Sequence, residues 1–252
     1  RSLDSGWASL EREHLAPIRA WSRSELPSPA PRAVFYPFSG PDFLFAYTFF
    51  PEAGDYLLVG LEPVGRVPEL AALPEEETAR RLRWVRQTLG DMLQISFFRT
   101  NDMKSGLADE GVLPILLVFL ARTGNQVLMV EPVGLDGQPE AAAGDGERPP
   151  RGVRVTFLPA GAEGPRRLYY FSVDLSDWSL KGKREFTRFI KGFEGPATYL
   201  KAASYLMYRE KYTRVRSLIL SRSEVLLQDD SGIPLPEFDP ARWDLKFYGT
   251  YT

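Results

Sequence analysis

The chain has no cysteine among its 252 residues. It can therefore form no disulfide, no cysteine nucleophile and no zinc–thiolate site. His14 is its single histidine, which excludes a metal site built from several histidines. A Ser-His-Asp triad would have to use this one residue of a predicted N-terminal helix as its base, so we do not expect one. We expect His14 to lie on the surface of that helix.

Long apolar runs are also missing. The longest, 112–121, is interrupted by Pro114 and is shorter than the roughly 18–20 residues that span a bilayer. Hydrophobic residues make up 44% of the chain and charged residues 25%, which is typical of a soluble globular protein with a sizeable core. The sequence starts at Arg1 rather than Met, which is compatible with a leader that has been removed.

The net charge is only −2, but it is unevenly distributed. Residues 181–222 contain eleven basic and three acidic residues, a local net charge of +8, which leaves −10 for the rest. Such asymmetry is typical of an anion-binding face. The alternative, which the pattern favours, is that these residues form the solvated faces of amphipathic helices. No nucleic-acid-binding motif accompanies them, so nucleic acid is not an expected partner.

The order of elements predicts an α/β fold with a mixed, mostly parallel central sheet flanked by helices, Rossmann-like, with a β-hairpin and a helical C-terminal third. We expect residues 1–31 to form a helical arm with a Pro-rich connector. Residues 32–252 then form a single α/β domain with a flexible loop at 135–151. Helices are predicted at 3–21, 74–94, 184–191, 197–208 and 212–221, and strands at 33–38, 56–61, 95–99, 126–130, 152–158, 167–173 and 224–227. Residues 111–122 fit a helix or a buried strand equally well.

The stretch 34–65 has the outline of half a nucleotide-binding fold. An apolar run ends at the turn Ser39-Gly40-Pro41-Asp42, and a second apolar run ends at Glu62. A glycine turn after a strand lets a ligand approach the backbone, and an acid about 20 residues later can accept hydrogen bonds from ribose hydroxyls. Glu62 lies 22 positions after Gly40, so this spacing predicts a ligand site that includes Ser39, Gly40 and Glu62.

This stretch resembles the first motif of the S-adenosylmethionine-dependent methyltransferases. The resemblance implies that Gly40 would lie at the cofactor's amino-acid part and Glu62 at its ribose. Asp102, after the third predicted strand, stands where that family often has an acid near the adenine. The chain departs from the family by having Gly40 as the only glycine of the turn, and Pro41 removes a backbone donor.

Asp229 and Asp230 follow the last predicted strand. Adjacent carboxylates of this kind, together with Asp42, could bind Mg²⁺ or Ca²⁺ and position a water molecule for metal-assisted hydrolysis. The alternative, which we favour, is a type I turn closed by Gly232.

Lys201, Tyr205 and Arg209 lie at i, i+4 and i+8, which would place them on one face of the predicted helix 197–208. Two cations flanking a phenol could hold a phosphate or carboxylate group. An exposed stripe without a ligand is the alternative, and the pattern favours it.

Polar residues follow most of the predicted strands. Because the carboxyl ends of parallel strands meet at one edge of a sheet, we expect these residues to converge there and to mark the default ligand site. They are Ser39, Asp42, Glu62, Asp102, Glu131, Asp229 and Asp230.

Four motifs spread along the chain, YPFSGPD, GLEPVG, KAASYLMY and LQDDSGIP, resemble those of an uncharacterised family of bacterial exported proteins or lipoproteins. The resemblance implies a periplasmic protein or a lipoprotein anchored to the outer membrane, with its leader upstream of Arg1. A cytoplasmic location is the alternative.

Together these observations predict an extracytoplasmic bacterial protein that binds a polar or anionic small ligand, or a cell-envelope component, at the strand-end edge of its sheet. A divergent S-adenosylmethionine-dependent enzyme is the first alternative. A hydrolase using Mg²⁺ or Ca²⁺ held by Asp229 and Asp230 is the second. Whether the protein is an enzyme stays open at this point.

Overall fold

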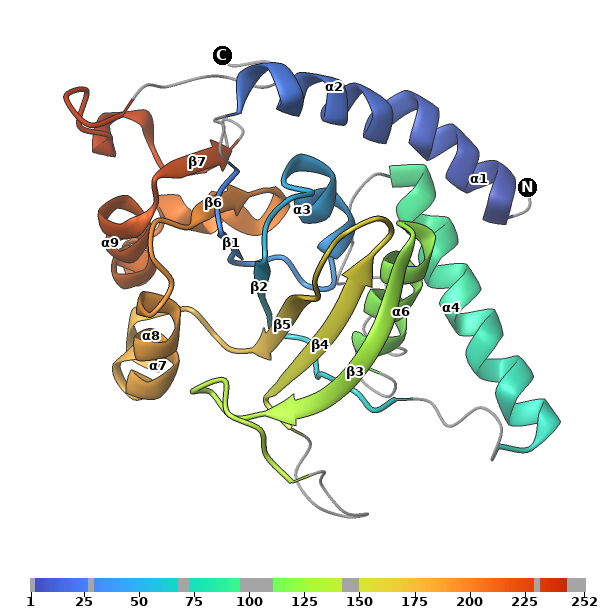
Figure 1. Ribbon diagram of the computed structural model, residues 1–252. Helices are drawn as coiled ribbons and strands as arrows, with labels where there is room; N and C mark the ends of the chain where they lie inside the picture. Colours follow the sequence, from blue (N-terminus) through green and yellow to red (C-terminus); the bar gives the residue numbers. More distant parts are fainter. Residues whose placement is uncertain are drawn as a thin grey trace.

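A single mixed sheet organises the computed structural model, with helices on both of its faces (Figure 1). The structure describes residues 3–26, 30–67, 73–95, 111–141, 150–228 and 232–243. Within them the seven strands lie in the order β3-β4-β5-β2-β1-β6-β7. The strands are β1 (Ala33–Tyr36), β2 (Asp55–Gly60), β3 (Asn125–Val133), β4 (Gly152–Pro159), β5 (Arg166–Ser172), β6 (Ala197–Leu200) and β7 (Val225–Gln228).

Most neighbouring strands run parallel. The pairs β5–β2, β2–β1, β1–β6 and β6–β7 are parallel, whereas β4 runs antiparallel to both β3 and β5. This confirms the predicted α/β class with its mostly parallel, Rossmann-like sheet. The predicted hairpin is also confirmed, as β4 and β5.

The helices form two layers. Figure 1 shows α3, α4, α6 and the α1–α2 rod on one side of the sheet, and α7, α8 and α9 on the other. The α-helices are α1 (Leu3–Leu10), α2 (Ala16–Glu25), α3 (Phe43–Phe49), α4 (Glu75–Ile95), α6 (Leu113–Arg122), α7 (Asp177–Lys181), α8 (Arg184–Lys191) and α9 (Thr213–Arg222). A π-helical turn, η1 (Glu11–Leu15), joins α1 to α2, and short 3₁₀ helices are η3 (Ala202–Tyr208), η4 (Glu210–Tyr212) and η5 (Leu235–Glu237).

Side-chain alternation along the central strands separates two hydrophobic cores. In β1, Val34 and Tyr36 face the core under α3 and α6, while Ala33 and Phe35 face the core under α8 and α9. Every residue of β1 is buried, as expected for a parallel strand that is covered on both faces. The N-terminal rod contributes Leu10, Leu15 and Ile18 to the first core, and His14 is exposed on it as predicted.

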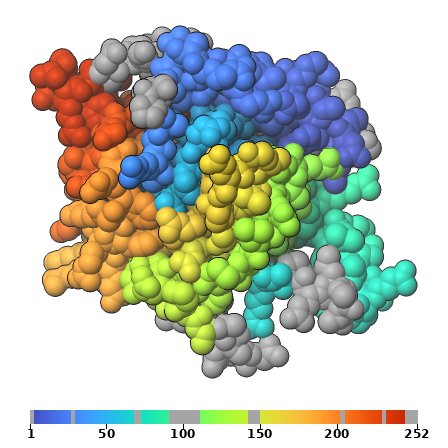
Figure 2. Space-filling view, viewed as in Figure 1, coloured from blue at the N-terminus to red at the C-terminus, as the bar shows by residue number. Residues whose placement is uncertain are grey.

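The antiparallel strands β3 and β4 are covered on one face only. Buried and half-buried positions alternate along β4, and Val153, Val155 and Phe157 point into the first core. Figure 2 shows β3 and β4, in green and yellow, forming the front surface of the molecule, with the orange C-terminal helices beside them. Among the described residues, no helix is both long and apolar enough to cross a membrane.

One predicted element is wrong, one open alternative is resolved, and one predicted strand lies mostly outside the described residues. The helix predicted at 197–208 is wrong: β6 occupies its first four residues, and η3 follows. The four residues of β6 are all buried between β1 and β7, so tertiary packing overrides the apparent helical spacing. Residues 111–122 contain a helix, α6, rather than a strand. Of the strand predicted at 95–99, Ile95 ends α4, and the remainder lies outside the described residues.

Two buried strand tyrosines should make the fold sensitive to alkaline pH. Burial raises the pKa of both Tyr56 and Tyr170 well above the ordinary value, and the nearby negative charge of Glu62 adds to the effect at Tyr170. Because the folded pKa lies above the unfolded one, this contribution to stability is complete below about pH 10 and is lost as the pH rises toward the folded values. We expect the free energy of unfolding to fall by about 2 kcal/mol between about pH 8 and about pH 11 through these two groups.

Urea unfolding curves at the two pH values would measure this loss. The double variant Tyr56→Phe/Tyr170→Phe should show a smaller loss between the two pH values, because phenylalanine does not ionise. The matched control Tyr205→Phe/Tyr208→Phe alters two half-exposed tyrosines and should follow the wild-type curve. Equal pH dependence in all three proteins would contradict the prediction.

Candidate functional site

The polypeptide reverses its direction of travel across the sheet at β1. From β1 the chain passes through α3 to β2 on one side and later returns through β6 on the other. In open α/β sheets this switch point leaves a crevice outside the carboxyl ends of the strands, where ligands commonly bind. The edge at which the parallel strands end is called here the carboxyl edge. Ser39, Asp42, Glu62 and Lys201 all lie on segments that follow β1, β2 or β6 directly, so all belong to this edge.

The loop that leaves β1 at the carboxyl edge is strained and firmly held. Phe38 has φ 60°, which is uncommon for a bulky residue, and Gly40 has φ 53°. The Ser39 amide donates to the Val59 carbonyl oxygen (2.8 Å), and the Val59 amide donates to Ser39 Oγ (3.0 Å). The Phe38 ring packs edge-on against Tyr212, with centroids 5.5 Å apart. Contacts on both sides therefore hold the loop in one conformation.

Asp42 is the centre of a buried polar cluster and is only 4% exposed. The Tyr36 hydroxyl donates to its Oδ2 (2.9 Å), and the Phe45 amide donates to its Oδ1 (3.3 Å), so Asp42 also caps α3. Lys201 Nζ lies 3.5 Å from Oδ2 and 3.2 Å from the centre of the Phe45 ring. The sheet order thus brings a carboxylate from the loop after β1 and an ammonium group from the residue after β6 together at the switch point.

Glu62 folds back over Gly60, the last residue of β2, and over Gly40 in the loop after β1. The Leu61 amide donates to Glu62 Oε2 (3.0 Å), and the Tyr170 hydroxyl donates to the Glu62 carbonyl oxygen (2.9 Å) and lies 3.2 Å from Oε2. A Cβ on Gly60 would collide with Glu62 Oε2, would lie 2.6 Å from the Tyr170 hydroxyl and would lie 3.0 Å from Gly40 Cα. Only glycine therefore fits at position 60 in this arrangement.

The expectation that Asp42 and Glu62 lie at the same end of the sheet agrees with this geometry. A Cβ on Gly40, two residues before Asp42, would lie 3.6 Å from both carboxylate oxygens of Glu62. Ser39, Gly40, Asp42 and Glu62 are therefore neighbours, and Lys201 joins them through Asp42.

Other predicted site residues are placed differently. Tyr205 lies in η3 and Arg209 follows it, so the helical stripe of Lys201, Tyr205 and Arg209 is wrong: Lys201 follows a strand, and the residues after it are 3₁₀ rather than α-helical. Glu131 lies inside β3 instead of after it and pairs with Arg154 of β4, with 2.9 Å between Oε1 and Nη2. Asp102, Asp229 and Asp230 lie outside the described residues. Within the described part of the chain, no three acidic or histidine side chains are grouped so as to hold a metal ion.

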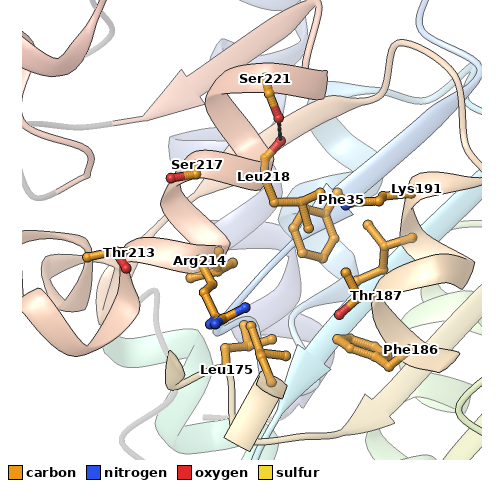
Figure 3. Close-up of a pocket in the computed structure, with 13 residues that line it drawn as sticks. Phe35, Leu175, Phe186, Thr187, Lys191, Thr213, Arg214, Ser217, Leu218 and Ser221 are labelled. Carbon is orange, nitrogen blue, oxygen red and sulfur yellow. Dashed lines mark hydrogen bonds between the residues drawn. The ribbon is translucent and has the colours of Figure 1, made fainter. Parts of the chain in front are cut away.

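A second feature, which the sequence analysis missed, is a hollow between α8 and α9 on the other face of the sheet (Figure 3). It encloses about 340 Å³, and its lining includes apolar, hydroxyl and cationic side chains. This hollow is called here the α8–α9 groove. Thr213, Ser217 and Ser221 line it at intervals of four residues along α9. This spacing of hydroxyl residues along a predicted helix was the one feature of the sequence that could have indicated the groove.

The N-terminal end of α9 is fixed to α7 at the groove. Asp177 Oδ1 accepts from the Arg214 amide (2.8 Å), and its Oδ2 accepts from the Thr213 amide (3.2 Å) and the Thr213 hydroxyl (2.6 Å). These bonds satisfy the first amides of α9 and align it beside α7. The groove is therefore held by hydrogen bonds as well as by the core beneath it.

Comparisons of this chain with models of protein families, with curated proteins and with solved structures found no match.

Proposed function

We propose that this protein binds a small polar or anionic ligand at the carboxyl edge of its sheet, beside the loop that leaves β1. The strained conformation of Phe38, in a loop held in place by the paired hydrogen bonds between Ser39 and Val59, is the observation that carries the proposal. Strained backbone that its surroundings hold in place occurs preferentially at ligand-binding and active sites. It lies here at the switch point of the sheet, the usual ligand position in this class of fold.

The groups at this edge suit a ligand with both hydroxyl groups and a negative charge. Lys201 keeps a fifth of its side chain exposed and is oriented by Asp42 and the Phe45 ring. Its ammonium group can contribute a charge-assisted hydrogen bond to an anion. Glu62 supplies carboxylate oxygens that can accept from ligand hydroxyls. The absence of side chains on Gly40 and Gly60 lets the Glu62 carboxylate lie close to the backbone of both loops, which positions its oxygens at this edge.

The location that we propose is the bacterial cell envelope. Its support is the motif resemblance to exported proteins, with which the cysteine-free composition is compatible. A cell-envelope component that carries a phosphate or carboxylate group would satisfy the same chemistry.

The methyltransferase and hydrolase alternatives stay predictions. Glu62 directs its oxygens to Leu61 and Tyr170 and lies over Gly40, so a cofactor at Gly40 would require this side chain to move. A rise in melting temperature with saturating S-adenosylhomocysteine would support the methyltransferase, and no rise would contradict it. A rise with Mg²⁺ or Ca²⁺ that Asp229→Ala abolishes would support the hydrolase.

The edge site can be tested with a double variant that removes its charges without leaving one charge buried alone. Asp42→Asn/Lys201→Met replaces the ion pair with a neutral pair of similar size, which proteins often tolerate. We expect a probe panel of inorganic phosphate, ribose 5-phosphate and adenosine monophosphate to include at least one compound that raises the melting temperature of the wild type. The double variant should bind that probe at least about tenfold more weakly, because the charge-assisted contact is lost.

Glu62→Gln should lower the affinity for ribose 5-phosphate and adenosine monophosphate, which carry hydroxyl groups, without changing the affinity for inorganic phosphate. The matched control is Lys181→Met, which removes an exposed cation from α7 and should leave binding unchanged. If no compound of the panel binds the wild type, or if the double variant binds as tightly as the wild type, the proposed function is wrong.

A further inference from the structure

We propose that the α8–α9 groove is a second binding site, separate from the carboxyl-edge cluster, for a small amphiphilic anion. The ligand would place a short alkyl chain or a single ring on the groove floor and a carboxylate or phosphate group at Arg214. The volume of about 340 Å³ is at the small end of the range for ligand pockets, which fits such a compact apolar part.

The floor of the groove is apolar because it is the top of the second hydrophobic core. Phe35 of β1 lies at its centre, and Leu180, Phe186 and Ile190 line it from α7 and α8. Figure 3 shows the Phe35 ring between the two helices, with Phe186 and Leu218 close to it. These floor side chains are almost fully buried, so the hydrocarbon surface that a ligand would cover belongs mainly to the half-buried Leu218 and Thr187 above them. An apolar group placed against these side chains would remove that surface from water, whereas an ion without an apolar part would leave it exposed.

Most hydroxyl groups in the groove already donate their protons within the protein and are poor donors for the anionic group of the ligand. The Thr213 hydroxyl donates to Asp177, the Thr187 hydroxyl donates to the Lys183 carbonyl oxygen (3.2 Å), and Ser221 Oγ donates to the Leu218 carbonyl oxygen (3.1 Å). With their protons engaged, these three oxygens mainly offer lone pairs. Apart from the Ser217 hydroxyl, the donors for an anion therefore come from the cationic side chains.

Arg214 and Lys191 supply those donors. Neither forms an ion pair with any other residue in the described part of the chain. Figure 3 shows Arg214 extending from α9 across the groove toward Leu175, while Lys191 lies at the opposite side. A guanidinium group can hold a carboxylate or phosphate with two parallel hydrogen bonds.

Arg214 is the better anion partner of the two. Lys191 is the last residue of α8, where the carbonyl end of the helix carries partial negative charge that opposes an anion. Arg214 is in the first turn of α9, where the amide end of that helix carries partial positive charge. Asp177 offsets that dipole, but its two oxygens are already engaged by the amides of Thr213 and Arg214 and by the Thr213 hydroxyl. The guanidinium group remains the dominant positive charge, on a segment with a net charge of +8.

Isothermal titration of the full chain with four probes tests both halves of the proposed ligand. Octyl phosphate and octanoate carry both halves, whereas 1-octanol and inorganic phosphate each carry one. We expect octyl phosphate or octanoate to bind at least about tenfold more tightly than either half alone, since apolar burial and the ionic contact act together.

Two variants and one control locate the site. Arg214→Gln should lower the affinity for the amphiphilic probe about tenfold and leave the affinity for 1-octanol unchanged, because it removes only the charge. Leu218→Trp should prevent the binding of both the amphiphilic probe and 1-octanol, since it adds a bulky ring over the floor of the groove. The control Arg188→Gln removes an exposed cation of α8 that does not line the groove, and it should change binding less than about twofold.

The proposal is overturned if no amphiphilic probe binds the wild type, or if Arg214→Gln binds as tightly as the wild type. Arg214 is exposed, so this variant is expected to fold normally. The double variant Asp42→Asn/Lys201→Met should bind octyl phosphate as the wild type does. Failure of the groove and failure of the edge site are therefore distinguishable.

Discussion

Replacing Asp42 by alanine is expected to lower the free energy of unfolding by about 4 kcal/mol. The substitution removes the acceptor of the Tyr36 hydroxyl, the cap of α3 at the Phe45 amide, and the carboxylate that compensates Lys201. Losing a cap typically costs about 1 kcal/mol, and losing a hydrogen bond from a buried hydroxyl costs about as much. The remainder comes from the loss of the ion pair with Lys201, whose side chain is only a fifth exposed.

Chemical denaturation of Asp42→Ala and Asp42→Asn separates these contributions. The asparagine variant keeps one oxygen, which can still cap α3 at the Phe45 amide, and its NH₂ group can donate to the Tyr36 hydroxyl oxygen. It should therefore lose about half as much stability as the alanine variant. Asp174→Asn, which changes an exposed carboxylate, should stay within about 0.5 kcal/mol of the wild type. If Asp42→Ala loses no more than this control, the cluster is not a structural centre of the edge.

The β1–α3–β2 unit could be predicted from the sequence because its signals are local. An apolar run, a turn with glycine and proline, a helix-sized segment and a second apolar run occur in the order that the structure shows, whereas the capping role of Asp42 is seen only in the structure. β6 could not be predicted in this way. It has four residues, is buried on both faces and shows no alternation, and η3 follows it directly. Only its position between β1 and β7, which is long-range information, makes it a strand.

The same distinction applies to the sites. Asp42 and Glu62 could be placed together because both follow parallel strands that are adjacent in sequence and in the sheet. Lys201 reaches Asp42 from 159 residues away, and no spacing pattern encodes that contact. The α8–α9 groove depends on how two helices pack side by side over Phe35, and only the spacing of Thr213, Ser217 and Ser221 hinted at it. Local chemistry was therefore predictable, whereas the partners that sheet order brings together were not.

Gly111→Ala should destabilise the protein about as strongly as Asp42→Ala, by about 4 kcal/mol. Gly111 has φ 72°, a conformation that costs a residue with a side chain about 1–2 kcal/mol. A Cβ at this position would also collide with main-chain atoms of Gly65 and would lie 2.6 Å from the carbonyl carbon of Val64. Backbone cannot rotate away as a flexible side chain can. The clash should therefore separate the start of α6 from the segment after β2.

That separation would break two hydrogen bonds, from the Val112 amide to the Pro63 carbonyl oxygen and from the Leu113 amide to the Val64 carbonyl oxygen, each 3.0 Å long. Gly124→Ala is the matched control, because Gly124 has a similar φ of 77° but a Cβ there would meet nothing within 4 Å. It should cost only the conformational part, about 1 kcal/mol. Urea unfolding of both variants measures the difference. If the two alanine variants lose equal stability, close backbone packing between Gly65 and Gly111 does not hold α6 against the end of β2.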